Sequence, residues 1–258
     1  MIRAIEQRGA VELAKRLLQI TGQIFRFAIA TGRARRDPTQ DLRGALRSPG
    51  PQKHRAALKA IDLPAFLRAL ESYEGDELTA LGIKLVLHTF VRSAEARFAT
   101  WSEFEGLEGP MPLWRIPAER MKARAEHLVP LTPQVVELLS QIRSSRRGSH
   151  LLFPSPARHG VISENTWIYA IYRLGYHSRV TVHGLRGTAS TILNEHGFNR
   201  DWIERQLAHT ERNGVRAAYN AAEWLADRRS MMRWWSDYLE QVGSASANGA
   251  LQPAPAYS

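Results

Sequence analysis

The chain has 258 residues, no cysteine, and a formal net charge of +10 from 35 Lys and Arg against 25 Asp and Glu. Its length suits one medium-sized domain with a smaller one, and the missing cysteines exclude disulfides and thiolate chemistry. It has no apolar run long enough to cross a bilayer, and its charged start is unlike a signal peptide, so we expect a cytoplasmic protein with no membrane partner. A strong positive charge favours a polyanionic partner, most simply nucleic acid.

One amphipathic helix is predicted near the start of the chain, over residues 11–31. Its large apolar side chains share one stripe: Leu13, Leu17, Ile20, Ile24 and Phe27. No other substantial element precedes the linker described next, and a lone amphipathic helix cannot bury its own stripe. We therefore expect residues 1–48 to be an incomplete helical unit, or one that docks on a partner.

A basic stretch follows, and its part over residues 49–60 is predicted to be a linker because it contains proline and glycine. Between Arg33 and Lys59 there are eight basic residues against two acidic ones, which is +6 of the total +10. Such a stretch either neutralises DNA phosphates or is a solvated surface loop, and charge alone does not separate the two. The candidate DNA-binding residues are Arg33, Arg35, Arg36, Arg43, Arg47, Lys53 and Arg55.

Residues 61–242 are predicted to form a second, compact domain that is mainly α-helical with a small antiparallel β-sheet (α+β). Helices are expected from Asp62, over 77–89, from a Ser93 cap to residue 98, from Pro133 after a Thr132 cap, and over 163–174, 182–196, 200–208, 213–222 and 223–242. The segments TWSEFE, PLWRIP and HLVPL alternate in character and are predicted strands. Residues 243–258 are expected to be a disordered tail. The last helix could pack on its own domain or on a neighbour.

Several chemistries lack their motifs. The sequence contains no GxxxxGK[ST], GxGxxG, HExxH or GxSxG. His183 and Arg186 in VHGLRGTAST are three residues apart, so on a helix they face one way, and small neighbours such as Gly184 would let a backbone or a ligand approach. This pair suits an anion better than a metal, although a capped helix start with an exposed arginine has the same pattern.

Further candidates lie elsewhere in the chain. Arg92 precedes a predicted helix, and Glu95 three residues later could hold either that arginine or the helix start. Lys122 lies between two predicted strands, where its ammonium could reach into a DNA groove or towards a leaving oxygen, or could belong to a solvated hairpin tip. His209 follows an apolar helix. Tyr219 in the next helix could be a half-buried core residue, or a nucleophile if a cationic pocket stabilises its phenolate.

Taken together, the order Arg92, Lys122, His183-x-x-Arg186, His209 and Tyr219 resembles that of the tyrosine recombinases of the phage integrase family. The segments VRSAEARFATWSEF, VHGLRGTAST and LAHTERNGVRAAYN are similar as well, and the resemblance covers roughly residues 11–242. It is most similar to integrases of prophages and genomic islands. Relative to that family, the chain is expected to be N-terminally truncated, with a partial core-binding domain over 1–48.

The resemblance implies site-specific recombination of double-stranded DNA at attachment sites through a covalent 3′-phosphotyrosine. Tyr219 would attack the phosphate that Arg92, Arg186 and His209 hold, Lys122 would protonate the leaving oxygen, and His183 would accept the tyrosine proton. Glu95 would support the site. No metal or cofactor is expected. The implied partners are DNA, three further protomers in a tetramer and accessory DNA-bending proteins, and the implied location is the bacterial nucleoid.

One local departure from the family pattern is Phe90, which stands two residues before Arg92 where the family usually has glycine. A positive φ there would strain a phenylalanine. Two other functions stay open. The chain could be a DNA-binding remnant that cannot complete recombination, or a phosphodiesterase that uses His183 or His209.

Overall fold

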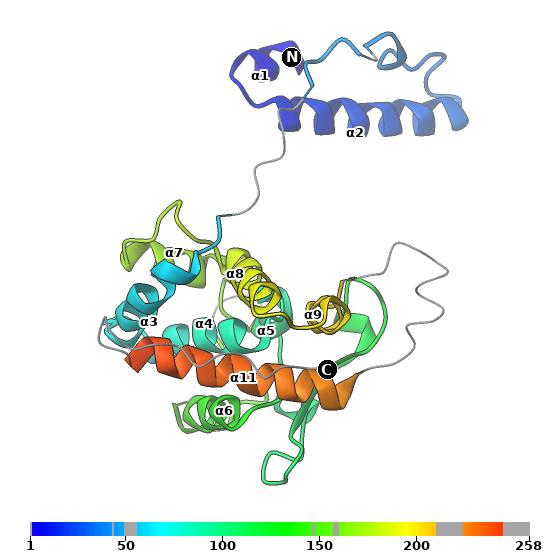
Figure 1. Cartoon of the computed structure of the whole chain (residues 1–258). Helices are drawn as coiled ribbons and strands as arrows, with labels where there is room; N and C mark the ends of the chain where they lie inside the picture. Colours follow the sequence, from blue (N-terminus) through cyan, green and yellow to red (C-terminus); the bar gives the residue numbers. More distant parts are fainter. Residues whose placement is uncertain are drawn as a thin grey trace. The chain divides into compact units, whose positions relative to one another are not determined.

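Helices and one short sheet make up the described part of the chain, which comprises residues 2–42, 44–48, 56–145, 148–156, 160–209 and 224–244 of a computed structural model. The chain divides into two compact units, Met1–His54 and Arg55–Ser258, and each is described by itself (Figure 1). Within these ranges, no helix is at once long and apolar enough to span a membrane.

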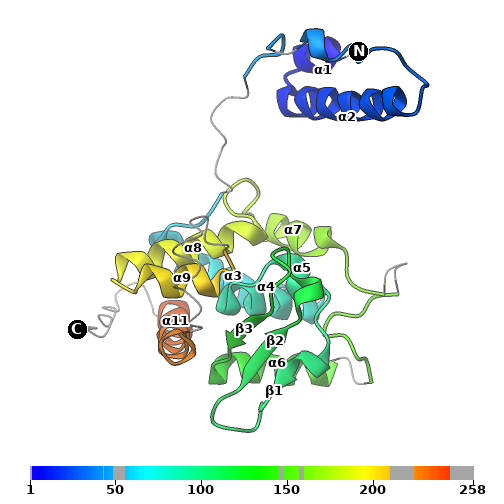
Figure 2. The same cartoon turned by 90° about the vertical axis from the view of Figure 1, so that its right-hand side faces the viewer.

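The first unit is built on α2 (Val11–Ala30), along which α1 (Ile2–Gln7) packs (Figure 2). The buried positions of α2 are small residues, Ala14 and Gly22. A Cβ atom on Gly22 would lie 2.7 Å from Thr39 Oγ1, so any larger residue would displace the turn that precedes η1 (Gln40–Leu42). Small side chains therefore decide which face of α2 is covered in this unit.

The predicted helix over residues 11–31 is confirmed, and the six-residue helix α1, which was not predicted, packs against it. The predicted apolar stripe lies mostly on the exposed side of α2. Its exposed members are Leu13, Ile20, Ile24 and Phe27. The stripe remains uncovered in the described part of this unit because the small residues, not the large ones, face α1 and the 37–39 turn.

The second unit contains the remaining described elements. In chain order these are η2 (Ala60–Asp62), α3 (Leu63–Glu71), α4 (Glu77–Thr89), α5 (Ser93–Arg97), η3 (Trp101–Glu103), β1 (Phe104–Glu105), β2 (Leu113–Ile116), η4 (Ala118–Arg120), β3 (His127–Pro130), α6 (Pro133–Ser145), α7 (Glu164–Arg173), α8 (Val182–Glu195), α9 (Arg200–Gln206) and α11 (Leu225–Ser244). The mainly α fold with a small antiparallel sheet is confirmed. The predicted helix over 213–222 lies outside the described residues, and α11 continues two residues into the segment expected as a tail.

The sheet has the strand order β1-β2-β3, and both pairs are antiparallel. Trp114 of β2 pairs with Phe104 on one side and with Val129 on the other. Its indole nitrogen donates to Glu103 at 2.8 Å. The predicted strand over residues 100–105 is confirmed only for its last two residues, because Glu103 reaches back to the Thr100 N–H and folds the preceding turn into η3.

Helix α4 is the centre of the core, and α6, α7, α8 and α11 all pack against it (Figure 1). Asp76 caps its start by accepting from the Leu78 N–H. The C-terminal helix α11 also contacts α3, α9 and β3 of its own unit. Its Trp235 is fully buried and donates to the Leu87 carbonyl at 2.9 Å. Of the two expectations for this helix, packing on its own domain is therefore confirmed.

The end of the predicted linker is part of this second unit. The Ala56 carbonyl accepts from Thr181 N at 3.1 Å, and the Leu58 N–H donates to Thr188 Oγ1 at 2.9 Å. A Cβ atom on Gly184 would lie 1.8 Å from the Ala56 carbonyl oxygen, which excludes any other residue there. Gly184 thus admits a backbone, which is one of the two kinds of close approach predicted from the sequence.

Candidate active site

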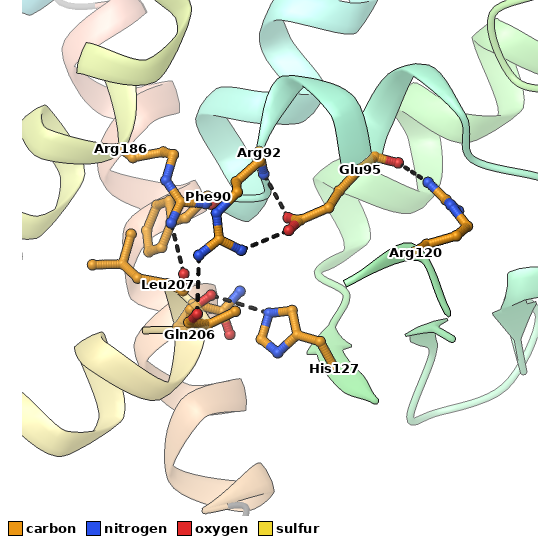
Figure 3. Close-up of polar contacts among 9 residues, drawn as sticks. Phe90, Arg92, Glu95, Arg120, His127, Arg186, Gln206 and Leu207 are labelled. Carbon is orange, nitrogen blue, oxygen red and sulfur yellow. Dashed lines mark hydrogen bonds and ion pairs between the residues drawn. The ribbon is translucent and has the colours of Figure 1, made fainter. Parts of the chain in front are cut away.

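Arg92 and Arg186 lie side by side at the C-terminal end of α9 (Figure 3). Arg186 comes from the second turn of α8, and its Nη2 donates to the Leu207 carbonyl at 2.6 Å. Arg92 lies between α4 and α5, and its Nη2 donates to the next carbonyl, that of Ala208, at 3.0 Å. Carbonyls at a helix C-terminus carry the negative end of the helix dipole and attract cations. Two arginines 94 positions apart in the sequence therefore converge on one point.

The two guanidinium groups differ in burial. The side chain of Arg92 is 26% exposed, whereas Arg186 is buried. Burial first, and then the positive charge of Arg92, lower the pKa of Arg186 to about 10. This value still leaves Arg186 fully protonated at neutral pH. Together the groups form a dense positive site that opens to solvent on the Arg92 side.

Glu95 holds Arg92 in place from the first turn of α5. Its two carboxylate oxygens accept from Arg92 Nη1 at 2.6 Å and from the Arg92 backbone N–H at 2.7 Å. The second bond makes Arg92 the N-cap of α5, so the predicted Ser93 cap was wrong. Glu95 is buried, and a buried carboxylate requires such partners. Both roles suggested for Glu95 from the sequence, holding the arginine and holding the helix start, are confirmed.

The backbone at Phe90 has the left-handed conformation, with φ 62° and ψ 11°. Its carbonyl accepts a hydrogen bond from Arg186 Nη1, so this strained turn also orients the buried arginine. The phenyl ring is fully buried, with its centroid 5.6 Å from that of Trp235. The structure thus shows the positive φ that would strain a phenylalanine, and burial of the ring offsets this strain of about 1–2 kcal/mol.

His209 directly follows the carbonyls that the arginines bind. Ala208, with φ 50°, ends the helical path. His209 Nδ1 lies 2.7 Å from Glu204 Oε2, and the backbone N–H of His209 donates to the Glu204 carbonyl at 3.1 Å. The contact with Glu204 orients the imidazole through Nδ1, and the side chain of His209 is half-exposed. Its other ring nitrogen, Nε2, is therefore the one that could contact a ligand.

Three other residues are predicted for the site, namely His183, Lys122 and Tyr219. His183 is exposed near the start of α8, one turn before the buried Arg186, and Thr181 caps that helix by accepting from Gly184 N at 2.9 Å. Lys122 is exposed in the loop between β2 and β3, and within the described ranges it makes no hydrogen bond or ion pair with the arginines. Tyr219 lies outside the described residues.

Three further residues of this region had not been singled out from the sequence. Arg120, two residues before Lys122, binds Glu103 and the Glu95 carbonyl, which anchors the start of the Lys122 loop. His127 on β3 and Gln206 on α9 meet through a hydrogen bond of 3.2 Å between Nε2 and the Gln206 carbonyl. The only local signal was a polar residue at an inward position of a strand or helix.

Three successive carbonyls at the C-terminal end of α9, those of residues 206–208, are therefore bound from three different segments of the chain. His127 binds the carbonyl of Gln206, Arg186 that of Leu207, and Arg92 that of Ala208 (Figure 3). Burial, together with nearby arginine charges, lowers the pKa of His127 well below its usual value, so its imidazole is neutral at pH 7. We call residues 206–208 the carbonyl run.

The candidate DNA-binding residues are on the protein surface where they are described. Arg33, Arg35, Arg36 and Arg47 are exposed. Arg36 forms an ion pair with Asp41. The other three, Arg43, Lys53 and Arg55, lie outside the described residues. The described residues contain no group of three or more His, Asp or Glu side chains that could hold a metal ion.

Comparison with known structures shows the fold. The chain is similar to a lambda integrase fragment solved as a dimer bound to a COC′ core site, with a TM-score of 0.59, 18% identity, and coverage of 86% of this chain and 77% of that chain. It is also similar to a lambda integrase tetramer bound to a Holliday junction, with a TM-score of 0.61, 18% identity, and coverage of 83% and 63%.

Comparison with curated sequences gives closer relatives. The integrase of Enterobacteria phage P4 is 41% identical over 256 residues, which cover 93% of this chain and 57% of the relative. The prophage integrase IntS of Escherichia coli K12 is 37% identical over 245 residues, with 93% and 62% covered. The chain thus spans about three-fifths of the length of these relatives.

Family models match both units. The phage integrase central domain matches residues 1–45. The phage integrase family model matches residues 57–224, which include every predicted catalytic position. With this match over most of its length, and with paired arginines that meet at one end of α9, the chain belongs to the phage integrase family of tyrosine recombinases.

Proposed function

We propose that this protein carries out site-specific DNA recombination by cleaving and rejoining strands through a covalent 3′-phosphotyrosine at Tyr219. The observation that carries the proposal is the convergence of Arg92 and Arg186 on neighbouring carbonyls, with His209 as the next residue of the chain. Family membership supports the reaction class. Two protonated guanidinium groups at one point suit a phosphate with two non-bridging oxygens.

The arginines bind the phosphate and oppose the charge that develops in the transition state. A guanidinium has five N–H donors, and within the described residues Arg92 and Arg186 each use their two Nη atoms for the contacts given above. Donors therefore remain on each group for phosphate oxygens. Because the groups are already oriented, they stabilise an extra negative charge without reorganisation.

The remaining roles complete the transfer. The Tyr219 oxygen attacks phosphorus and forms the phosphotyrosine bond as the bond to the 5′ oxygen breaks. Lys122 gives a proton to that oxygen, and His183 accepts the tyrosine proton. His209 donates to the phosphate through the nitrogen that Glu204 does not hold. Religation reverses each step, and the tyrosyl ester retains the energy of the phosphodiester.

The first unit and the basic linker contribute DNA binding in this proposal. The exposed arginines Arg33, Arg35, Arg36 and Arg47, together with Arg43, Lys53 and Arg55, neutralise backbone phosphates. Residues 1–48 act as part of a core-binding domain, 49–60 as a basic linker and 61–242 as the catalytic domain, and the central-domain match supports the first assignment. Four protomers join two duplexes, as the lambda integrase tetramer on a Holliday junction suggests. Attachment sites in the bacterial nucleoid are the substrate, and accessory proteins bend the DNA.

The proposal is tested by trapping the covalent intermediate. The full chain is incubated with a pool of duplexes of random core sequence, each carrying a nick next to the cleavage site so that the short strand diffuses away. Adducts that survive detergent are isolated and their DNA is sequenced. A tyrosine adduct that is enriched in one sequence and absent from Tyr219→Phe is expected.

Other outcomes favour the alternatives. Binding to duplexes without any adduct would identify the chain as a DNA-binding remnant that cannot recombine. Continuous hydrolysis without an adduct would identify a phosphodiesterase. An adduct that persists in Tyr219→Phe would show that a different residue is the nucleophile.

A further inference from the structure

A buried polar network surrounds the side chain of Gln206, the last residue of α9. Its Nε2 donates to the Thr89 carbonyl at 2.8 Å. Its Oε1 accepts from Arg228 twice, from Nε at 3.1 Å and from Nη2 at 2.7 Å. Its backbone carbonyl binds His127. Gln206 is fully buried and contacts α4, α11 and β3. It is the first residue of the carbonyl run, and Arg186 and Arg92 donate to the carbonyls of the two residues that follow it.

Arg228 extends the network from the first turn of α11. It is fully buried, and its Nη2 also donates to the carbonyl of Leu128 on β3. Taking a guanidinium out of water costs several kcal/mol unless hydrogen bonds compensate it. The bonds to Gln206 and Leu128 therefore hold α11 to the end of α9 and to β3 at the same point.

The network lies at both ends of the segment 210–223, which contains Tyr219. Before the segment, Gln206 is followed by the carbonyls that Arg186 and Arg92 bind. After it, the Arg228 N–H donates to the Trp224 carbonyl at 2.8 Å and begins α11. Residues 210–223 themselves lie outside the described residues. The bond between Gln206 and Arg228 nevertheless determines how far apart the two flanking ends are held.

We propose that Gln206 and Arg228 are a positioning pair that sets the geometry in which the nucleophile-bearing segment meets the phosphate-binding arginines. This inference rests on the proposed function, because it assigns the pair a role in forming the phosphotyrosine. In this role, neither residue is assigned a contact with the reacting atoms. They act through the carbonyl run on one side and through the start of α11 on the other. A misplacement of about 1 Å in such a site can slow a reaction about 10²-fold.

The chemistry of the two side chains explains why this pair suits the task. An amide both donates and accepts, so Gln206 can satisfy Thr89 and Arg228 together. A glutamate would turn a second acceptor toward the Thr89 carbonyl. The guanidinium presents two parallel donors to one oxygen, which fixes orientation as well as distance, whereas a lysine presents a single point of charge.

The test compares adduct formation with folding stability in matched variants. The variants are Gln206→Met, Arg228→Met and the double variant, and Ser236→Ala is the control. Ser236 is also a buried polar residue of α11, but its partners at 2.9 Å are His88 and Thr132, on α4 and at the start of α6, away from the carbonyl run. Rates are measured in single turnover at saturating DNA, on a nicked duplex that gives the wild-type adduct.

Each single variant is expected to form the adduct at least tenfold more slowly, while the Kd for DNA changes less than twofold. Each single variant leaves the other member of the pair buried without its partner. The double variant removes both members, so it should be more thermally stable than Arg228→Met or Gln206→Met. Its rate should remain low, because the link between α9 and α11 is still missing. Ser236→Ala should lose stability and keep its rate within twofold of the wild type.

A rate that recovers together with stability in the double variant overturns the inference, as does an equal loss of rate in Ser236→Ala.

A second measurement does not depend on the cleavage reaction. Hydrogen exchange without DNA should quicken at residues 207–209 and 224–228 in either single variant, and a change at one end alone contradicts coupling of the two ends. Failure of the wild type to form any adduct contradicts the proposed function, and unchanged exchange in the variants contradicts the positioning pair.

Discussion

Arg92 and Arg186 donate to adjacent carbonyls, those of Ala208 and Leu207, which directly follow α9, although neither arginine belongs to that helix. Each also has a second partner that orients it, Glu95 for Arg92 and the Phe90 carbonyl for Arg186. The negative end of α9 therefore holds two like charges together before DNA is bound. Two guanidinium groups that are already oriented at one point are what the proposed phosphate-binding role requires.

Replacing Arg186 with lysine should impair both folding and chemistry. A lysine cannot reach Phe90 and Leu207 with a planar fork, so a buried carbonyl loses its donor at a cost of about 1–3 kcal/mol. Adduct formation should slow by roughly 10²-fold or more. Urea unfolding and single-turnover cleavage measure the two effects. Arg97→Lys is the matched control, because Arg97 also donates to a carbonyl of this unit, that of Ile162 at 2.8 Å. Equal rates in the two variants would contradict the assignment of Arg186.

The left-handed backbone at position 90 predicts an unusual order of stabilities. Phe90→Gly and Phe90→Ala both lose a fully buried ring, which costs about 3–5 kcal/mol before any relief of strain. Glycine adopts φ 62° without penalty and alanine does not, so the glycine variant should be about 1 kcal/mol more stable than the alanine variant. Urea denaturation of both variants checks this. An alanine variant at least as stable as the glycine variant would show that the backbone relaxes.

The stability of the fold should fall in mild acid because of His88. Its Nδ1 is 2.9 Å from Ser236 Oγ. Burial, and then the charge of Lys84, lower the pKa of His88 from 6.5 to about 4. Between these values the unfolded chain binds a proton that the folded chain does not, so stability decreases as pH falls, by about 3 kcal/mol at most.

The variant His88→Asn tests this pH dependence, since asparagine can keep a contact near the Nδ1 position but does not titrate. Urea unfolding between pH 7 and pH 4 should show a smaller loss of stability than in the wild type. Some loss should remain, because the pKa of His127 is lowered in the same direction. An unchanged loss in His88→Asn would exclude His88 as its source.

The contact between Glu204 and His209 predicts a modest kinetic role for the carboxylate. Both side chains are more than 40% exposed, so the pair is worth about 0.2–1 kcal/mol. Glu204→Ala should therefore slow adduct formation about two- to fivefold, because the imidazole loses its orientation. His209→Ala, which removes the donor itself, should be slower by a larger factor. Single-turnover rates distinguish this orienting role from a role of Glu204 in folding alone, because a role in folding alone would leave the rate of adduct formation unchanged.

The exposed arginines of the first unit should determine part of the salt dependence of DNA binding. Replacing Arg33, Arg35 and Arg36 with glutamine should reduce the slope of log K against log salt by as much as ~2, because Asp41 already offsets the charge of Arg36. Arg115→Gln is the control, because Glu105 and Glu126 already offset that charge. Titrations at several salt concentrations measure the slopes, and equal slopes in the triple variant and the wild type would place DNA elsewhere.

Much of the secondary structure was predictable because its signals are local. Thr132 and Pro133 mark the start of α6, and the alternating segments near Trp114 mark the strands. The first turn of α5 shows the limit of such signals. Ser93 is a common cap residue, but Glu95 reaches the Arg92 N–H, and competition between two plausible caps is settled only by where the buried carboxylate finds its partners.

The candidate site was predictable as a set of residues and not as an arrangement. Arg92, His183, Arg186 and His209 stood out through their order and through resemblance to a family. His127, Gln206 and Arg228 did not, because a buried polar residue has no distinctive local pattern. Its role depends on which distant groups satisfy its hydrogen bonds.

By itself, the sequence determined the class of fold, the positive charge and the family resemblance that singled out the candidate site residues. Only the tertiary structure decided that the end of α9 gathers Arg92 and Arg186, that small residues cover one face of α2, and that α11 closes on its own domain. The physical reason is range. Helix, strand and cap preferences act over a few residues, whereas partners for buried charges and carbonyls come from segments a hundred residues apart, which meet only when the whole core is packed.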